Sequence, residues 1–314
     1  MVAVAESRPV MPSNIEWTDE TWNPTRGCRR ISPGCEHCYA ERVAARFCGP
    51  GAPYEGLLQL GRARWNGAAR FVGDALDLPL HWRQPRKIFV DSMSDLFYEG
   101  FTDDQIDRVW AVMILCYWHT YQVLTKRPAR AAQWFERPDF YDRILRAADE
   151  FRRAHPGLWG PDRRGLDTIG ISNPYSHPAR NIWLLVSVED QKRAAERLPA
   201  LERCRAAVRG VSYEPALELV DFGPWLGWLI QWLIIGGESG GGARVFDMAW
   251  GRAALMQAAA YRVPAFFKQA GKKPLEAGRL LRLKASKGNN PAEWPPEFRV
   301  QQWPSIRHPC GGGV

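Results

Sequence analysis

Long apolar runs are absent from the 314-residue sequence. A transmembrane helix needs about 18 or more consecutive apolar residues, and no run reaches this length. The longest apolar stretch, residues 225–237, is interrupted by Gly227 and Gln231 and predicts a buried strand with the segment leading into it. The N-terminus also lacks the apolar core of a signal peptide. We therefore expect a cytoplasmic protein with no membrane partner.

The composition also lacks the bias of a disordered chain. Hydrophobic residues make up 46% and charged residues 24% of the sequence, as in a soluble globular protein. Positive charge is in moderate excess, because 42 Lys and Arg residues against 34 Asp and Glu residues give a net charge of +8. This excess indicates a polyanionic partner, with nucleic acid first, since phosphates bind clustered cations. An Arg-rich composition from a GC-rich genome gives the same excess, so charge alone does not decide.

Cysteine is present in an unusual arrangement. Three of the seven cysteines, Cys28, Cys35 and Cys38, form a C-x6-C-x2-C cluster in a loop that contains glycine and proline. A structural zinc site normally has four protein ligands, whereas an iron–sulfur cube held by three cysteines keeps one iron open. A disulfide suits an odd, tightly spaced set poorly. The spacing therefore predicts a metal centre and favours iron–sulfur over zinc.

The remaining cysteines are expected to have other roles. Either His37 or Cys48 could complete a zinc site, but their positions are typical of a loop residue and a helix-end thiol. An apolar helical pattern surrounds Cys116 and predicts core packing. No motif accompanies Cys204 or Cys310.

The hydrophobic pattern alternates short β-type runs with helical stretches. Repeated units of this kind predict an α/β fold with a parallel sheet, and a strand leading into Cys28 makes about six or seven units, which suits a partial or full (β/α) barrel. The predicted strands are Lys87–Val90, Tyr121–Leu124, Ile182–Val188, Ala207–Ser212, Trp232–Ile235 and Ala265–Phe267. The predicted helices include Tyr39–Phe47, Thr102–Cys116, Ala129–Ala154 and Gln191–Leu198.

Four parts of the chain follow from this pattern. Residues 1–13 are expected to be a disordered leader, and residues 14–272 to form the barrel. A Pro-, Gly- and Arg-rich stretch at about 156–180 predicts a loop insertion. Residues 273–314 are expected to form a basic C-terminal extension.

Polar residues follow nearly every predicted strand. The carboxyl ends of parallel strands meet at one edge, where catalytic side chains collect, so these residues are expected to ring one mouth of the barrel. Lys126 and Arg127 are candidates to pair with a carboxylate or a phosphate. Glu189, Glu214 and Glu238 could accept hydrogen bonds from a ribose or an ammonium group, or could pair with those cations.

Fifteen tryptophans are many for this length. Four of them lie near basic residues in the sequence, namely Trp65, Trp82, Trp159 and Trp303. Aromatic side chains interleaved with Arg or Lys suit unstacked bases, although ordinary core packing explains most tryptophans equally well.

Several short motifs occur in a fixed order along the chain. They are Trp17–Pro24, Gly27-Cys28, Ser32–Cys35, Cys38–Glu41, Asp91–Phe97, Leu124–Pro128, Ser212–Pro215, Gly236–Gly240 and Phe266–Gln269. This series, from about Trp17 to Gly271, closely resembles the phage Gp37/Gp68-like proteins, a three-Cys-motif family (DUF5131). That family is similar to radical S-adenosylmethionine (SAM) enzymes, which use a partial (β/α) barrel and a cubane on three cysteines.

The resemblance implies a barrel of the radical SAM type, with a [4Fe–4S] cluster on the three cysteines and SAM chelating the open iron. The first two cysteines are three residues further apart than in most of those enzymes. An aromatic residue usually lies near the adenine, and here Tyr39 has that place. Residues 91–95 occupy the position expected for contacts to the SAM amino group, whereas a Gly-Gly-Glu motif comes later. The predicted cofactor-binding residues are Tyr39, Asp91, Ser92, Asp95, Lys126, Glu189, Glu214, Gly236, Gly237 and Glu238.

The leading hypothesis is therefore a radical SAM enzyme that acts on nucleic acid or a modified nucleotide and needs an electron donor. One alternative is a non-catalytic nucleic-acid-binding protein with a structural zinc or iron–sulfur site. Another is a redox sensor that loses and rebuilds its cluster.

Overall fold

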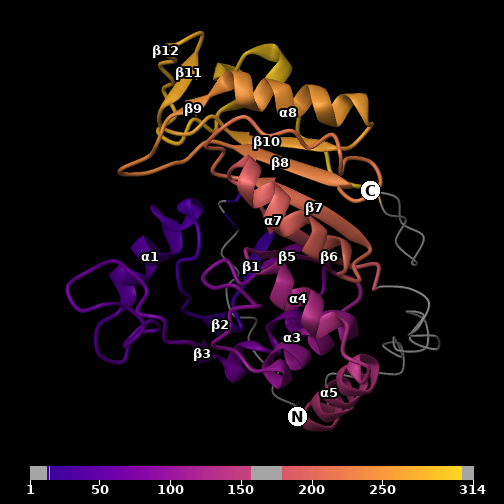
Figure 1. The fold of residues 1–314 in the computed structure, drawn as a ribbon. Helices are drawn as coiled ribbons and strands as arrows, with labels where there is room; N and C mark the ends of the chain where they lie inside the picture. Colours follow the sequence, from indigo (N-terminus) through magenta and orange to yellow (C-terminus); the bar gives the residue numbers. More distant parts are fainter. Residues whose placement is uncertain (1–12, 14, 157–178, 306–314) are drawn as a thin grey trace.

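A curled parallel sheet forms the centre of the protein, which is described here from a computed structural model (Figure 1). The structure describes residues 13, 15–156 and 179–305. Seven strands lie side by side in chain order, so each strand is added next to the one before it and the sheet curls into a half-barrel. They are β1 (Glu20–Trp22), β4 (Lys87–Val90), β5 (Thr120–Thr125), β6 (Ile182–Ser187), β7 (Val208–Tyr213), β8 (Trp232–Gly236) and β10 (Ala265–Gln269). The partial barrel is confirmed, and the described strands do not close it, because β1 and β10 are its two edges.

Each predicted strand overlaps one strand of this sheet, and the bounds of β4 are those predicted. The strand expected before Cys28 is β1, but it ends at Trp22. A short strand, β2 (Thr25–Arg26), follows it and pairs antiparallel with β3 (Arg70–Phe71). The cysteine loop therefore begins after a separate two-stranded antiparallel sheet and not directly after a barrel strand.

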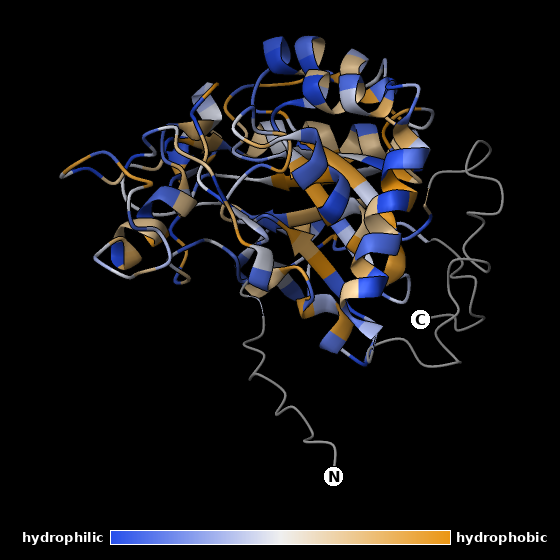
Figure 2. Cartoon of the chain, turned by 90° about the horizontal axis from the view of Figure 1, so that it is seen from below, coloured by the Kyte–Doolittle hydropathy of each residue, from blue (hydrophilic) through white to orange (hydrophobic). Residues whose placement is uncertain are grey.

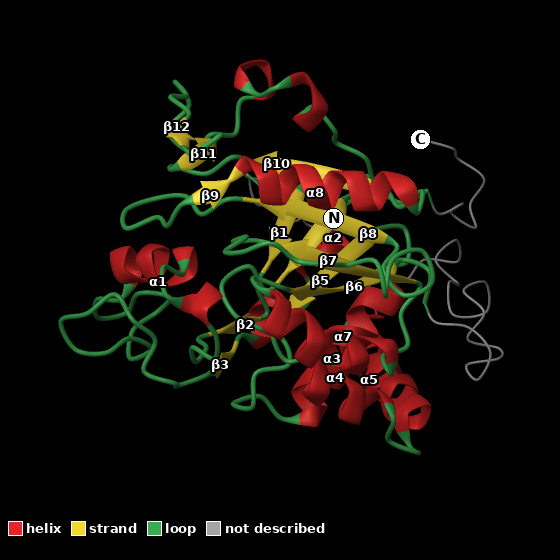
Figure 3. Cartoon of the chain, turned by 45° about the horizontal axis from the view of Figure 1, so that its top comes forward, coloured by secondary structure: helices red, strands yellow, loops and turns green. Residues whose placement is uncertain are grey.

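Helices flank the outside of the half-barrel (Figure 3). They are α2 (Leu78–His81), α3 (Asp103–Leu115), α4 (Pro128–Phe135), α5 (Phe140–Ala154), α7 (Gln191–Glu202) and α8 (Met248–Ala260), with a 3-10 turn, η3 (Gly73–Ala75), before α2. One prediction is wrong: the continuous helix expected at 129–154 is two helices, α4 and α5. The break contains Pro138, and proline disfavours a helical preceding residue and cannot donate a backbone hydrogen bond. No helix in the described ranges is long and apolar enough to cross a bilayer.

The two faces of the sheet bury different clusters. The outer face packs against the helices in the large core, and Figure 2 shows the strands mainly in the hydrophobic colours beneath them. The inner face carries a second cluster that includes three buried tryptophans, Trp17, Trp183 and Trp232. Trp183 and Trp232 meet edge to face, with ring centroids 5.5 Å apart. These side chains fill the inside of the half-barrel, so a ligand must enter from the carboxyl ends of the strands.

The chain beyond the sheet folds back onto it. The strands β9 (Phe246–Asp247), β11 (Pro274–Glu276) and β12 (Arg279–Leu280) form a small second sheet, and two 3-10 turns follow, η6 (Pro291–Glu293) and η7 (Pro296–Phe298). Trp294 and Phe298 are buried against Phe267 of β10, with ring centroids 4.8 and 4.7 Å away. The described part of the expected extension thus contributes to the core. Most of the expected leader and of the expected insertion lies outside the described residues.

The start of α3 gives a stability prediction. Thr102 accepts a hydrogen bond from the backbone N–H of Gln105, and the Gln105 side chain accepts one from the backbone N–H of Thr102, which is a complete capping box. Replacing Thr102 by Ala is expected to lower the free energy of unfolding by about 1 kcal/mol. Urea unfolding measures this change. Thr102→Ser keeps the oxygen and should retain most of the stability; an equal loss in both variants would show that the cap is not the cause.

Candidate metal and cofactor site

The three clustered cysteines line one cavity at the carboxyl ends of the strands. Cys28, Cys35 and Cys38 are each half-buried, and the cavity they share has a volume of about 110 Å³. Its polar lining also comes from Arg29, Arg30, Tyr39, Asp91, Ser92, Ser94, Asp95, Thr125, Lys126, Arg127 and Ser187. Phe89 and Leu124 reach it from the inner face of the sheet. The structure therefore brings together one loop and the ends of β4, β5 and β6.

The thiols surround this cavity without meeting at a point. Among the described residues, no three His, Cys, Asp or Glu side chains are placed as ligands of a single metal ion. The other candidate zinc ligands lie elsewhere: His37 packs against Gly242, and the exposed Cys48 thiol donates to the Ala45 carbonyl. Cys116 is buried in the core, as predicted, Cys204 is buried there as well, and Cys310 lies outside the described residues.

Two glycines let the cysteine loop fit against its surroundings. Gly27 has a φ of +89°, and a Cβ there would lie 2.3 Å from the Ala68 carbonyl oxygen. Gly34 lies in a 3-10 turn, η1 (Pro33–Cys35), where a Cβ would lie 2.6 Å from a carboxylate oxygen of Glu189. Only glycine permits both the left-handed backbone and these approaches. The loop then leads into α1 (Tyr39–Ala44) and a 3-10 turn, η2 (Ala45–Phe47).

Glu189, which follows β6, holds this loop in place. Its Oε1 accepts hydrogen bonds from the Ser32 hydroxyl and, at 3.1 Å, from the Gly34 backbone N–H. Its Oε2 accepts from Nη1 of Arg197 at 2.7 Å. Burial opposes ionisation, but the Lys126 and Arg197 cations outweigh it and lower the pKa of Glu189. Both carboxylate oxygens of this predicted cofactor residue are thus bound to protein groups. Glu189 holds the cysteine loop in position and does not contact the cavity.

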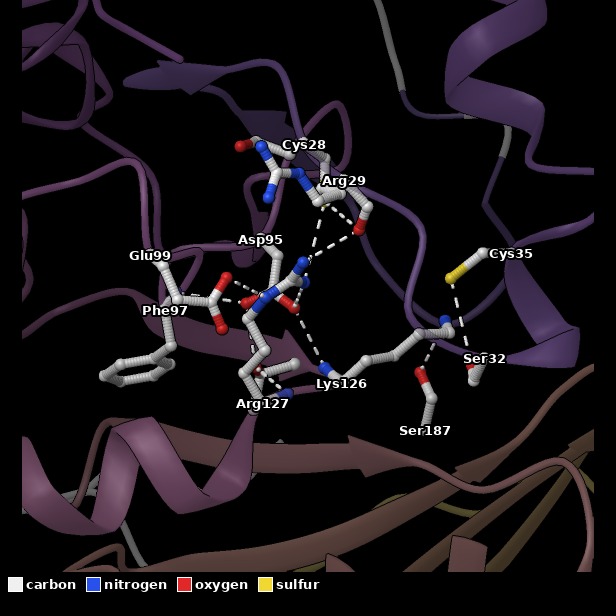
Figure 4. Close-up of polar contacts among 12 residues, drawn as sticks. Cys28, Arg29, Ser32, Cys35, Asp95, Phe97, Glu99, Lys126, Arg127 and Ser187 are labelled. Atoms are coloured by element: carbon white, nitrogen blue, oxygen red, sulfur yellow. Dashed lines mark hydrogen bonds and ion pairs between the residues drawn. The ribbon is translucent and has the colours of Figure 1, made fainter. Parts of the chain in front are cut away.

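Lys126 points from the end of β5 toward Cys35 (Figure 4). Its ammonium donates to the Ser187 hydroxyl at 3.1 Å. Burial works against the charged thiol, yet the Lys126 cation and hydrogen bonds from the loop backbone together lower the pKa of Cys35. Burial raises the pKa of Cys38 instead. The three thiols are therefore not equivalent, and Cys35 is the one held nearest to its ionised form.

Arg127 forms a second connection, from the same strand end to Cys28 (Figure 4). Its Nη1 lies 3.6 Å from the Cys28 sulfur and 3.0 Å from Oδ2 of Asp95, and its Nη2 donates to the Arg29 carbonyl at 2.8 Å. Its guanidinium also pairs with Glu99 at 2.9 Å. Burial, followed by the nearby Asp95 carboxylate, raises the pKa of Cys28 to about 12.

The two carboxylates after β4, Asp91 and Asp95, differ in how many hydrogen bonds they already accept from the protein. Asp95 accepts four hydrogen bonds, from the backbone N–H groups of Phe97 and Lys126, the Thr125 hydroxyl and Arg127, so it is saturated. Asp91 is also buried, and its Oδ1 accepts from the Thr25 N–H at 3.0 Å. Its Oδ2 has no hydrogen-bond partner in the described part of the chain. Burial raises the pKa of Asp91 to about 8.

Tyr39 and Ser92 connect the loop to β4. The Tyr39 hydroxyl donates to the Ser92 carbonyl, while the Ser92 hydroxyl donates to Oδ1 of Asn23 at 3.0 Å. Tyr39 as a whole is 45% exposed, and it lines the cavity. It is thus placed where a flat ligand group could lie against it.

The other predicted cofactor residues lie outside the lining of this cavity. Glu214 pairs with the Lys268 ammonium at 2.6 Å. Glu238 is held by Arg244, which also pairs with Glu36 of the cysteine loop at 3.0 Å. Burial opposes ionisation of Glu238, but the hydrogen bonds from Arg244 outweigh it and lower the pKa of Glu238.

The two glycines of the later motif serve packing. A Cβ on Gly237 would lie 2.5 Å from the Ala270 carbonyl oxygen, so this position is filled by its neighbours. A Cβ on Gly236 would make ordinary contacts with Glu214 and Gln269. The Gly-Gly-Glu segment therefore braces the cysteine loop from β8 and does not line the cavity.

Some lining residues were missed by sequence reasoning. Trp65 is buried beside the cavity in a small cluster with Ala40, Ala44, Leu57 and Met93, and it was interpreted only as a stacking candidate. Trp65 is far from the cysteines along the chain and belongs to no motif with them, so the sequence did not indicate that it lines the cavity. Ser187, in contrast, is one of the polar residues at strand ends that were expected to ring the mouth of the barrel, and it ends β6 and lines the cavity.

The remaining tryptophan candidates do not surround this site. Trp82 packs near Arg86, whose guanidinium lies 5.8 Å from the ring centroid. Trp303 stands 5.4 Å from the ammonium of Lys87, the first residue of β4, and therefore lies at the opposite ends of the strands. Trp159 lies outside the described residues.

Comparison with known proteins identifies the family. A family model described as a protein of unknown function, DUF5131, matches residues 12–294. No curated protein matches the chain, and no solved structure does. The match covers all seven strands of the half-barrel and the cysteine loop. The chain belongs to the DUF5131 family, as its ordered motifs predicted.

Proposed function

We propose that the protein is an iron–sulfur enzyme of the radical SAM type, related to the phage Gp37/Gp68-like proteins. Its [4Fe–4S] cluster would be held by Cys28, Cys35 and Cys38. The observation that carries the proposal is that three thiols from one loop line a single cavity above the strand ends of a parallel half-barrel. In such sheets ligands bind at the carboxyl ends of the strands.

The residues present fit such a group. Thiolates are the ligands of iron–sulfur clusters, and a cube held at three of its irons needs sulfurs around a cavity. Three thiolates would also bring negative charge into a partly buried site. Lys126 and Arg127 place positive charge beside Cys35 and Cys28, respectively, and offset it. A single zinc ion would need a fourth ligand, and neither His37 nor Cys48 lines the cavity.

When bound, a cluster with one open iron would bind SAM and supply the electron for its reductive cleavage, which requires an external electron donor. The chain would orient the ligand and exclude water. Oδ2 of Asp91 has no partner among the described residues, and an ammonium group beside it would favour the ionised carboxylate that accepts its hydrogen bond, whereas Asp95 is saturated. Tyr39 is partly exposed and lines the cavity. Phe89 and Leu124, from the inner face of the sheet, give the cavity an apolar side.

The proposal is tested by anaerobic reconstitution with iron and sulfide. We expect a brown protein with about four irons per chain, a spectral change on adding SAM, and 5′-deoxyadenosine after reduction. A colourless protein that holds one zinc ion per chain would contradict the proposal. If the protein is brown but never forms 5′-deoxyadenosine, the cluster part of the proposal stands and the cleavage of SAM is contradicted.

Lys126 gives a prediction for ligand binding. Replacing Lys126 by Met removes a cation that faces the cavity, and loss of one charge-assisted hydrogen bond costs about 1.5–3 kcal/mol. SAM affinity should therefore fall by roughly tenfold to a hundredfold. Equilibrium binding to the reconstituted protein measures it. Lys192→Met, on the exposed side of α7, serves as the matched control. Unchanged SAM affinity in Lys126→Met with normal iron content would place the ligand elsewhere.

A further inference from the structure

Most of the positive charge excess of the protein lies in one segment beside the cysteine cavity. Residues 26–70, which we call the cationic arm, contain eight Arg, no Lys, three Glu and no Asp. The arm therefore carries a net charge of +5, out of +8 for the whole chain. Figure 1 shows it standing out from the half-barrel around α1.

The arm is held in a defined shape. Arg26 and Arg70 both donate to the Pro53 carbonyl at 3.1 Å, and Asn66 donates to the Gly56 carbonyl at 2.8 Å. Glu41 accepts from the Arg30 guanidinium and from the Trp65 backbone N–H. These bonds fix a surface whose charges keep stable positions relative to the cavity.

Part of this charge has no partner. Four arginines of the arm are exposed and form no ion pair with any described residue: Arg29, Arg46, Arg62 and Arg64. The three glutamates do not offset them, because Glu41 pairs with Arg30, Glu36 pairs with Arg244, and Glu55 accepts from the Gly51 N–H. Exposed charge of one sign that the protein leaves uncompensated favours a ligand of the opposite sign.

The arm also exposes apolar side chains among these arginines. Phe47 is 52% exposed directly after Arg46, and Leu60, two residues before Arg62, is fully exposed. Guanidinium groups bind phosphates in a bidentate manner, and aromatic faces stack on unpaired bases. The combination fits a flexible chain that carries both phosphates and bases.

We propose that the cationic arm binds a single strand of nucleic acid and directs one nucleotide toward the cysteine cavity. An intact duplex fits less well, because a stacked and paired base must leave the helix before any enzyme can act on it. Arg29 lies at the junction, because it is exposed on the arm and also lines the cavity. This inference depends on the proposed function only for what happens at the cavity; binding to the arm needs no cluster.

The test is fluorescence anisotropy of the full chain with a labelled oligothymidine of about 20 nucleotides, which exceeds the usual site size of one binding module. The variant Arg62→Ala/Arg64→Ala is expected to bind about tenfold more weakly and to reduce the slope of log K against log salt by about 0.7 for each lost phosphate contact. Its matched control is Arg146→Ala/Arg153→Ala, two exposed arginines of α5, which should bind like the parent protein.

Three results would overturn the inference. The control variant could lose as much affinity as the arm variant, which would show that binding depends only on the net charge of the protein. The parent protein could fail to bind the oligonucleotide at low salt. Vesicles of anionic phospholipid could bind in preference to the strand, which would make the arm a membrane surface. Each titration is run before and after reconstitution, with iron measured separately, so a missing cluster and a missing nucleic-acid site give different outcomes.

Discussion

Replacing Cys35 by Ala is expected to remove the iron of the reconstituted protein, and the same result is expected for Cys28 and Cys38. Each thiol lines the same cavity, so each would bind a different iron of one cluster. Two remaining cysteines cannot hold a cube that is already one ligand short of four. Iron content per chain should fall from about four to near zero.

The matched controls are the two buried cysteines of the core. Cys116→Ala and Cys204→Ala also remove a thiol, but both side chains lie in the hydrophobic core, away from the cavity. They should keep the full iron content even where the small loss of packing lowers stability. Full iron retention in Cys35→Ala would remove the basis of the proposed function. Loss of iron in the core variants would show that the assay reports folding and not ligation.

The architecture was predictable because the pattern of a buried parallel strand is local. Each strand of the half-barrel is a short run of aliphatic and aromatic residues, as in Ile182–Ser187, and each is followed by enough chain for a crossover. The break between α4 and α5 was also readable, since Pro138 stands inside the predicted helix. It was missed because the periodicity on both sides is helical.

The arrangement of the site depended on contacts that sequence does not encode locally. Glu189 was expected to meet a ligand or a nearby cation, but its Oε1 accepts from a loop more than 150 residues earlier in the chain, as the hydrogen bond from Gly34 shows. Its Oε2 accepts from Arg197 of α7. The Gly236-Gly237 pair was predicted to bind the cofactor, but Ala270 and Phe246 fill the space beside Gly237. Trp294 and Phe298 looked like parts of a tail until the fold placed Phe267 beside them. Which polar groups stay free for a ligand is decided by tertiary pairing.

Replacing Glu189 by Gln is expected to destabilise the protein strongly. The carboxylate is fully buried, and Arg197 opposite it is 6% exposed, so the substitution leaves a buried guanidinium without its anion. Removing one partner of a buried pair costs about 3–5 kcal/mol. Urea unfolding at neutral pH measures this loss. Glu196→Gln, on the exposed face of α7, removes the same charge and should change stability by less than about 1 kcal/mol.

The pH dependence of this loss identifies its cause. The pKa of Glu189 is lowered in the folded protein, so the stability it contributes is fully present above the unfolded pKa of about 4.3. That stability is lost as the pH falls through the lower pKa of the folded state, because both states are then protonated. The difference between the parent protein and Glu189→Gln should therefore be largest at neutral pH and shrink in acid. A difference that stays constant down to acid pH would mean that altered packing, and not the charge, is responsible. Because Glu189 also holds Ser32 and Gly34, the variant should bind iron less completely at neutral pH, which ties the stability of this pair to the position of Cys35.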